Sequence, residues 1–341
     1  MKIRSLVKNC ILSILGDYIG TVMINYILTR PLNKYYNKSN ARACNVNKLV
    51  IFMADGKVPC WGLCDRLKGI LSTYKYCSEN NIDFKINFIN PFCLDEFLMP
   101  NLIDWKISKD EISYNSIDSK GVRMAFVSRK RDITDNILSI MYRLQNRVLS
   151  LNYKQLHIYT NVRLIGDSFS VYFHELFKPT AELQNEIDFH KHCIGSSYIA
   201  IQFRFLELLG DFKDEDCDDV IELNDLSQRK KMIDSGLKVI RMIKKNNPEY
   251  KKILLASDSS TFLNVVKDLE YVYVVPGDIG HSGFVFSKNT NMKTFVDLFM
   301  LANASKIYSV IIPPMEKSKY GFAECASLIN NVPFEQIIFT N

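Results

Sequence analysis

The stretch of sequence that decides the fold is YIAIQFRFLELLGDF, residues 198–212. Its first six residues form a mostly apolar run, which is typical of a buried strand. Arg204 follows that run directly, and Gly210 and Asp211 come soon after. Ligands of open α/β sheets bind beyond the carboxyl ends of the strands, and a guanidinium can donate two hydrogen bonds to a phosphate. The stretch therefore predicts a strand that ends at a site for a phosphate-bearing ligand.

Strands and helices alternate on both sides of this stretch, which is the pattern of a parallel sheet. The chain has 341 residues, with 47% apolar and 23% charged residues, as expected of a soluble globular protein with two domains. We expect two Rossmann-like halves that face a central cleft, preceded by a polar linker and a basic arm. The expected regions are an arm over 1–45, a first domain over 46–194 and a second domain over 195–341. The expected strands are 48–54, 84–91, 121–128, 154–161, 198–205, 251–258, 272–277 and 306–312, and the expected helices are 67–77, 132–150, 227–245, 260–268, 292–302 and 320–330.

The positive charge of the chain is concentrated at its amino-terminal end. The whole chain carries +6, whereas residues 1–50 hold eight Lys or Arg and a single acid, so the remainder carries −1. A neutral body argues against a nucleic-acid partner. A basic arm fits an anionic surface instead.

Residues 3–28 of this arm carry apolar side chains at helical spacing. Asn9, Asp17 and Asn25 interrupt the apolar stretch, so it is a poor transmembrane span. Two interpretations stay open. One is an amphipathic helix on the inner face of the cell membrane, which makes the protein cytoplasmic and peripheral. The other is a helix that packs on the protein's own body.

Neither the cysteines nor the acids predict a metal site. Nine cysteines, an odd number without zinc-finger spacing, indicate reduced thiols in a cytosolic protein. The acidic run between Asp211 and Asp225 is by default a solvated loop. A divalent-metal site is the sharper interpretation, but the run lacks the spacing of a calcium loop.

Gly62, Asp65 and Arg66 follow the first expected strand. A glycine there allows a tight turn, and a helix that starts near Arg66 directs its N–H groups at the cleft. In the functional interpretation this loop touches the phosphates or the acceptor. In the structural interpretation Asp65 caps the helix and Arg66 pairs with a surface carboxylate.

Three further loops each contribute candidate ligand contacts. Asp258 ends a strand, where it caps a helix or, if the serines after it do so, accepts hydrogen bonds from a nucleoside. Ser318, Tyr320 and Gly321 precede the last expected helix, whose amino terminus can seat a phosphate. His281 lies in a glycine-flanked loop, where it contacts the ligand or sits on the surface.

Taken in order, these motifs resemble the fucosyltransferase superfamily of the α1,6-fucosyltransferases, nodulation fucosyltransferases and protein O-fucosyltransferases. Among its members, the chain looks most like bacterial glycosyltransferases of polysaccharide gene clusters. The resemblance covers about residues 48–341. It is carried by WGLCDRLKGILSTYKYC (61–77), similar to the family's Gly-x-x-Asp-Arg-Leu-x-Gly loop, by IAIQFRFLELLGDF (199–212), similar to its His-x-Arg strand, and by ILLASDSSTFL (253–263), MKTFVDLFMLANASKIYSV (292–310) and SKYGFAECASL (318–328), similar to its donor-site motifs.

The resemblance implies a GT-B fold and an inverting transferase that needs no metal or other cofactor. It implies a GDP-sugar donor, with GDP-fucose first, and a glycan or lipid-linked oligosaccharide acceptor in surface polysaccharide synthesis. By position, Arg204 binds the β-phosphate and stabilises the leaving GDP. Asp258 contacts the guanosine, and Ser318, Tyr320 and Gly321 line the phosphates.

The chain departs from the family pattern at two positions. Gln202 stands where the family often has His, and Phe205 stands where it has a second Arg. Gln202 cannot titrate, so another group must accept the proton of the acceptor hydroxyl. Glu207 and Asp211 are the nearest carboxylates in sequence, and we prefer Asp211 because Gly210 can place it at a turn. Two alternatives follow: a GT-B enzyme that uses GDP-mannose or a UDP-sugar, and a non-catalytic member that binds a nucleotide or glycan.

Overall fold

The structure is a computed structural model that describes residues 2–59, 61–126, 135–211, 223, 225–280, 283–311 and 321–338. The chain divides into two compact units. Unit 1 is Met1–Leu94 with Pro100–Lys178, and unit 2 is Asp95–Met99 with Pro179–Asn341. Our predicted division at residues 194 and 195 differs from this one, because helix α5 (Ala181–Ile194) belongs to unit 2. The arm over 1–45 is part of unit 1.

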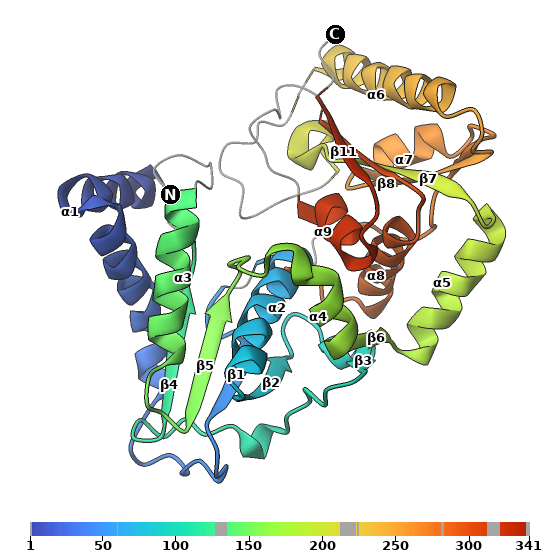
Figure 1. Cartoon of the computed structure of the whole chain (residues 1–341). Coiled ribbons are helices and arrows are strands. Elements are labelled where there is room, and N and C mark those ends of the chain that lie inside the picture. The colour runs from blue at the N-terminus through green and yellow to red at the C-terminus, as the bar shows by residue number, and fades with distance from the viewer. Residues whose placement is uncertain are drawn as a thin grey trace. The chain divides into compact units, whose positions relative to one another are not determined.

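Unit 1 is built on a four-stranded parallel sheet with the order β2-β1-β5-β4. Helix α2 packs on one face of it (Figure 1). A Cβ atom on Gly69 of α2 would lie 2.1 Å from the carbonyl oxygen of Thr160, so only glycine allows this close approach. The strands are β1 (Leu49–Ala54), β2 (Asp83–Phe88), β4 (Ser119–Met124) and β5 (Gln155–Thr160), and the helices are α1 (Lys2–Thr29), α2 (Leu63–Glu79), α3 (Asp135–Leu149) and α4 (Phe169–Leu176), with short 3-10 turns η1 (Arg30–Tyr35), η2 (Leu94–Glu96), η3 (Lys109–Glu111) and η4 (Gly166–Ser168).

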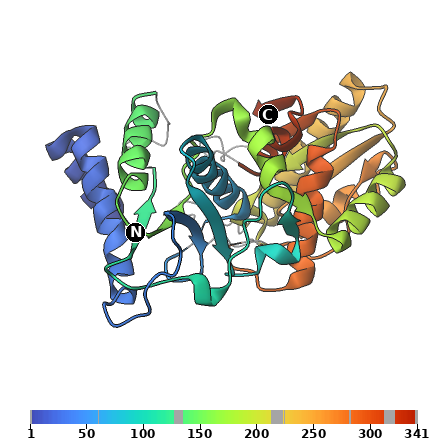
Figure 2. The ribbon, with the colours of Figure 1, turned by 60° about the horizontal axis from the view of Figure 1, so that its bottom comes forward.

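Helix α1 covers the free edge of β4, beside α3 (Figures 1 and 2). The side chain of Asn25 accepts the backbone N–H of Ala125 at 2.7 Å and donates to the carbonyl of the same residue at 3.3 Å. The hydroxyl of Thr29 accepts the N–H of Arg123 at 3.1 Å. An open edge strand presents unpaired N–H and C=O groups. The two side chains of α1 therefore take the place of a neighbouring strand.

Unit 2 is built on a five-stranded parallel sheet with the order β11-β10-β7-β8-β9. Strand β7 lies at its centre, and all six of its residues are buried. The 198–205 strand was therefore predicted with its start correct and its end two residues late. The strands are β7 (Tyr198–Phe203), β8 (Lys252–Ser257), β9 (Val272–Tyr273), β10 (Ile307–Ile311) and β11 (Phe334–Ile338), and the helices are α5, α6 (Leu226–Asn246), α7 (Ser260–Val266), α8 (Lys288–Ala302) and α9 (Gly321–Asn330), with a 3-10 turn η5 (Leu206–Leu209).

The segment Asp95–Met99 joins unit 2 although it lies within the sequence of unit 1. Its buried Phe97 stacks on Phe295 of α8, with ring centroids 4.6 Å apart and planes 9° from parallel. The carbonyl of Phe97 also accepts the N–H of Thr180 at 2.9 Å. The chain pairs β3 (Leu98–Pro100) with β6 (Phe177–Pro179) where it passes between the two units.

Candidate functional site

Arg204 lies directly after central strand β7, as the sequence predicts. The neighbouring strand β8 ends in register with it, because Phe203 is opposite Ser257. Asp258 follows β8, so Arg204 and Asp258 end neighbouring strands on the same edge of the sheet. The Arg204 side chain is 22% exposed, and its Nε lies 3.9 Å from Oδ2 of Asp258. A cation and a buried anion therefore meet at the carboxyl edge of unit 2.

The carboxylate of Asp258 holds the backbone that follows Arg204. One oxygen accepts the N–H of Phe205 at 2.7 Å, and the other accepts the N–H of Leu206 at 2.9 Å. Leu206 has φ of 52°, so the chain turns sharply here. Burial raises the pKa of Asp258 to about 6, against the opposing effect of Arg204 and these two N–H groups. The predicted role at the guanosine is untested, whereas these bonds give Asp258 a positioning role for Arg204.

Asp258 does not cap helix α7, and neighbouring residues do so. Ser259 is the N-cap, and its hydroxyl accepts the N–H of Phe262 at 3.1 Å. Asp211 adds a second anchor: its carboxylate accepts the hydroxyls of Ser259 and Ser260, both at 3.0 Å, and the N–H of Thr261 at 2.6 Å. The serines therefore release Asp258 from capping, as the sequence allowed.

The surroundings of Asp211 oppose its predicted role as a base. Partial burial acts to raise its pKa, but the hydrogen bonds from Thr261, Ser259 and Ser260 outweigh burial and lower the pKa. Gly210 has φ of 78°, so the expected turn before Asp211 is present. In this conformation Asp211 serves as an anchor for α7 and is a weak proton acceptor.

The two positions that depart from the family pattern are both buried. The amide of Gln202 donates to the carbonyl of Phe203 at 3.0 Å and accepts the hydroxyl of Ser309 on β10 at 3.5 Å. The ring of Phe205 lies parallel to that of Phe203 at 5.9 Å and tilted against that of Phe262 at 4.8 Å. Gln202 and Phe205 therefore stabilise the sheet and its apolar core.

Three of the predicted donor-site residues, His281, Ser318 and Tyr320, lie outside the described residues, as does the acidic run over 212–222. Gly321 is the first residue of α9. The helix expected over 320–330 is thus present in the described residues, and the contact of Gly321 with a phosphate stays a prediction.

The loop after β1 in unit 1 differs from its structural interpretation, and its predicted contact with the phosphates or the acceptor stays a prediction. Helix α2 begins at Leu63 with Gly62 as its N-cap, so it starts before Arg66, and Asp65 lies within its first turn. Arg66 is 1% exposed, which excludes a surface ion pair. Its guanidinium lies 4.3 Å from the ring centroid of Phe88 and donates to the carbonyl of Asn90 at 3.0 Å. Arg66 therefore holds the loop after β2 in place.

Sequence reasoning missed a buried polar cluster at the end of β1. Asp55 accepts hydrogen bonds from Lys57 at 2.5 Å, Tyr114 at 3.2 Å and Tyr159 at 3.3 Å. Burial lowers the pKa of Lys57, but its bonds to Asp55 and Tyr114 outweigh burial and raise it. A pocket of about 320 Å³ opens beside this cluster, lined by Tyr35, Asn40, Ala41, Lys57, Ile112 and Tyr114. The signal for it was Asp55 itself, a carboxylate directly after a buried strand.

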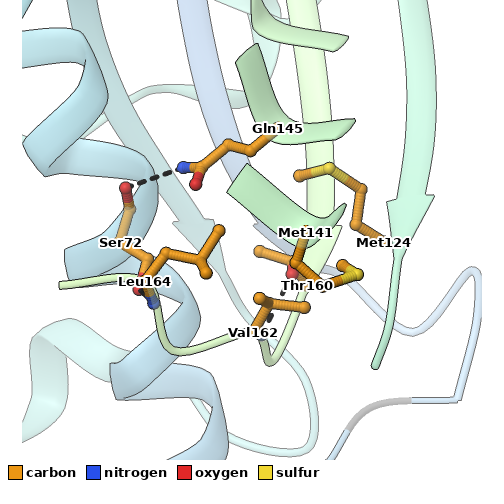
Figure 3. Close-up of a pocket in the computed structure, with 7 residues that line it drawn as sticks. All are labelled: Ser72, Met124, Met141, Gln145, Thr160, Val162 and Leu164. Carbon is orange, nitrogen blue, oxygen red and sulfur yellow. Dashed lines mark hydrogen bonds between the residues drawn. The ribbon is translucent and has the colours of Figure 1, made fainter. Parts of the chain in front are cut away.

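A second hollow in unit 1 is part of the core and no ligand site. It lies between α2, α3 and the loop after β5, where Gln145 donates to the carbonyl of Ser72 at 2.9 Å (Figure 3). It has no room for a water molecule. Within the described ranges, no group of three or more His, Cys, Asp or Glu could hold a metal ion.

The chain matches no family model and no curated protein, but it does match solved structures. NodZ α-1,6-fucosyltransferase soaked with GDP-fucose is 14% identical, with a TM-score of 0.52 over 83% of this chain and 92% of that one. Fucosyltransferase NodZ from Bradyrhizobium is 14% identical, with a TM-score of 0.53 over 84% and 94%. The chain has the fucosyltransferase fold.

A plant enzyme has this fold as well. A mutant of Arabidopsis thaliana FUT1 in complex with GDP is 11% identical, with a TM-score of 0.53 over 91% of this chain and 73% of that one. The resemblance predicted from the motifs is thus confirmed as an α/β fold with parallel sheets. Identities this low show the fold alone, so the donor and the acceptor are matters for a proposal.

Proposed function

We propose that the chain is an inverting glycosyltransferase that transfers fucose from GDP-fucose to a glycan or lipid-linked oligosaccharide. The observation that carries the proposal is Arg204 at the carboxyl end of the central strand of unit 2. The fold supports it, because the solved NodZ structures include one soaked with GDP-fucose and one co-crystallised with GDP. A partly exposed guanidinium here can bind a diphosphate and stabilise the charge of the leaving GDP.

In this proposal the other residues divide into positioning and binding roles. Asp258 holds the backbone of Phe205 and Leu206, and thereby fixes the start of the Arg204 side chain. Gly321 lies in the amino-terminal part of α9 that the structure describes, and N–H groups at a helix amino terminus suit a phosphate. The sequence predicts Asp211 as the base, but the three hydrogen bonds that its carboxylate accepts favour an anchoring role instead. The transfer needs no metal, so we expect unchanged activity in EDTA.

A titration with nucleotides tests the donor. A ligand that binds only the folded chain raises its melting temperature. We expect GDP and GDP-fucose to stabilise the wild-type protein and UDP to have no effect. Arg204→Ala removes the stabilisation, whereas Arg241→Ala, at an exposed position of α6, retains it. Stabilisation by UDP or GDP-mannose alone would still support a glycosyltransferase, but one that uses a donor other than GDP-fucose.

A non-catalytic nucleotide-binding protein is the second candidate. It is favoured by Gln202 and Phe205, which occupy two motif positions with buried structural side chains. Release of GDP from GDP-fucose distinguishes the candidates. A transferase releases GDP slowly in water and faster with a suitable acceptor, and Arg204→Ala abolishes both. Tight binding of GDP without any release would establish the non-catalytic role.

A further inference from the structure

The outward face of α1 after the break at Gly16 is mostly apolar, with the acid Asp17 at its start. Ile19 is 58% exposed, Met23 42% and Tyr26 68%, and their spacing places them on one side of the helix. Tyr18 and Ile27 extend the same face. Of the 24 exposed large apolar side chains among the described residues, eight lie on α1. Scattered apolar residues are ordinary on a protein surface, but a row of them on one helix indicates an interaction site.

Three polar residues of α1 lie on the face that contacts the protein. Thr21, Asn25 and Thr29 follow one another at intervals of four residues, and all three are buried. Asn25 and Thr29 bind the edge of β4. A helix on a soluble protein normally buries its apolar face and exposes its polar face. Here the polar stripe Thr21, Asn25 and Thr29 faces the protein, and the row around Met23 faces outward.

The same contacts oppose a helix that crosses a membrane. The stretch Val7–Tyr35 is long and apolar enough to do so, with a mean hydropathy of 1.6. However, Gly16 breaks the helix with φ of 72°, and Leu12 of the first part packs against Gly20 of the second. A spanning helix would also remove Asn25 and Thr29 from β4 and leave that edge open. The geometry therefore favours a helix that lies on a surface.

The positive charge near α1 indicates which kind of surface the apolar row contacts. Arg30 and Lys34, both exposed, follow the apolar row on the chain, and residues 1–50 carry eight Lys or Arg against one acid. A second copy of the chain would bring the same positive charge to the interface. Anionic lipid headgroups bring the opposite charge.

We propose that the outward face of α1 binds an anionic lipid bilayer. The row Tyr18, Ile19, Met23, Tyr26 and Ile27 enters the interface, and Arg30 and Lys34 lie among the headgroups. The chain is then a peripheral membrane protein that is anchored through unit 1. This inference rests on α1 alone and holds for any donor bound by unit 2.

Co-sedimentation of the full chain with vesicles tests the proposal. The probe is a vesicle of phosphatidylcholine with roughly one part in three phosphatidylglycerol, with vesicles of pure phosphatidylcholine beside it. We expect binding to the anionic vesicles that weakens as salt is raised. The double variant Ile19→Glu, Met23→Glu should bind at least about tenfold more weakly, because two apolar anchors become charged. Both positions are exposed, so its melting temperature should equal that of the wild type.

The matched control carries the same change elsewhere. Leu226 and Phe286 of unit 2 are 78% and 73% exposed, and the double variant Leu226→Glu, Phe286→Glu should bind vesicles like the wild type. Equal loss in both double variants would overturn the proposal, since it would reflect added negative charge alone. A dimer in analytical ultracentrifugation that the Ile19→Glu, Met23→Glu variant abolishes, without vesicle binding, would assign the face to a second copy. Vesicle-bound protein that resists extraction at high pH would indicate a spanning helix and would overturn it too.

Discussion

Asp258 lies beside Arg204 at the ends of two neighbouring parallel strands, and its carboxylate binds the two N–H groups that follow Arg204. Nε of Arg204 and Oδ2 of Asp258 are 3.9 Å apart, which is longer than a hydrogen bond. The hydrogen bonds of the Asp258 carboxylate therefore come from the backbone N–H groups of Phe205 and Leu206, and its contact with Arg204 is an ion pair. A change at Asp258 should disturb the position of the arginine and the stability of the unit together.

We expect Asp258→Asn to lower the free energy of unfolding by about 1–3 kcal/mol, because one of the two backbone N–H groups loses its acceptor in a buried place. Affinity for GDP should fall as well, since Arg204 loses its support. Urea denaturation and calorimetric titration with GDP measure the two effects. Asp268→Asn, at an exposed position, is the control for the loss of one carboxylate. Weaker GDP binding at unchanged stability would instead place Asp258 at the nucleotide.

The variant Asp211→Asn distinguishes between two roles of Asp211, as an anchor of α7 and as the catalytic base. As an anchor of α7, Asp211 accepts three hydrogen bonds, so its loss should lower stability by about 1 kcal/mol. Turnover of the folded enzyme should stay within a few-fold of the wild type. Thermal melting and the rate of GDP release from GDP-fucose with acceptor measure these. A fall in turnover of more than about a hundredfold at unchanged melting temperature would establish Asp211 as the base.

His157 makes the stability of the protein depend on pH. It is buried in β5, and Tyr36 lies 2.7 Å from its Nδ1. Burial lowers the pKa of His157 to about 3, so the folded chain keeps the ring neutral. The unfolded chain takes up a proton below about pH 6.5. The contribution of His157 to the free energy of unfolding is therefore fully present above pH 6.5, and it falls by about 1.4 kcal/mol per pH unit below pH 6.5.

Denaturation in urea at several pH values measures this slope. The variant His157→Gln, which keeps an acceptor near Tyr36, should lose stability less steeply than the wild type between about pH 6.5 and pH 5. His192→Gln, on an exposed part of α5, is the matched control. Identical slopes for the wild type and His157→Gln would contradict a neutral buried ring.

The bonds between α1 and β4 should contribute measurably to folding. Asn25→Ala removes the partner of both the N–H and the carbonyl of Ala125, and we expect a loss of about 1–3 kcal/mol in the free energy of unfolding. Urea denaturation measures the loss, with Ser13→Ala at an exposed position of α1 as the control. A loss equal to that of Ser13→Ala would mean that α1 detaches from β4 before the rest of unit 1 unfolds.

Apolar runs predicted the central strands well because those strands are buried on both faces. β1 and β7 begin within one residue of the prediction. Strand β11 was missed because most of its residues are exposed, so its sequence carries no continuous apolar run. The start of α2 was placed too late because Gly62 caps it without a side-chain bond, which leaves no capping residue to recognise.

For the candidate site, strand order predicted the position of Arg204 but not the partners of the side chains around it. Two residues that follow parallel strands can be expected at one edge of a sheet, and Arg204 and Asp258 do lie there. The bonds from Asp258 to Phe205 and Leu206 depend on a turn with positive φ, which no local pattern announces. The burial of Arg66 is equally hidden, because arginine is mostly exposed in proteins.

The segment around Phe97 decides how the protein can be divided. Phe97 lies within the sequence of unit 1 but belongs to unit 2, and in unit 2 its ring stacks on Phe295. A fragment that starts at residue 179 would contain the whole five-stranded sheet and still lack this ring, so that Phe295 would lose its stacking partner. Because the chain passes between the units more than once, no single proteolytic cut can release either unit intact. A fragment that keeps unit 2 whole must therefore also carry Asp95–Met99, so the two units are best produced as one chain.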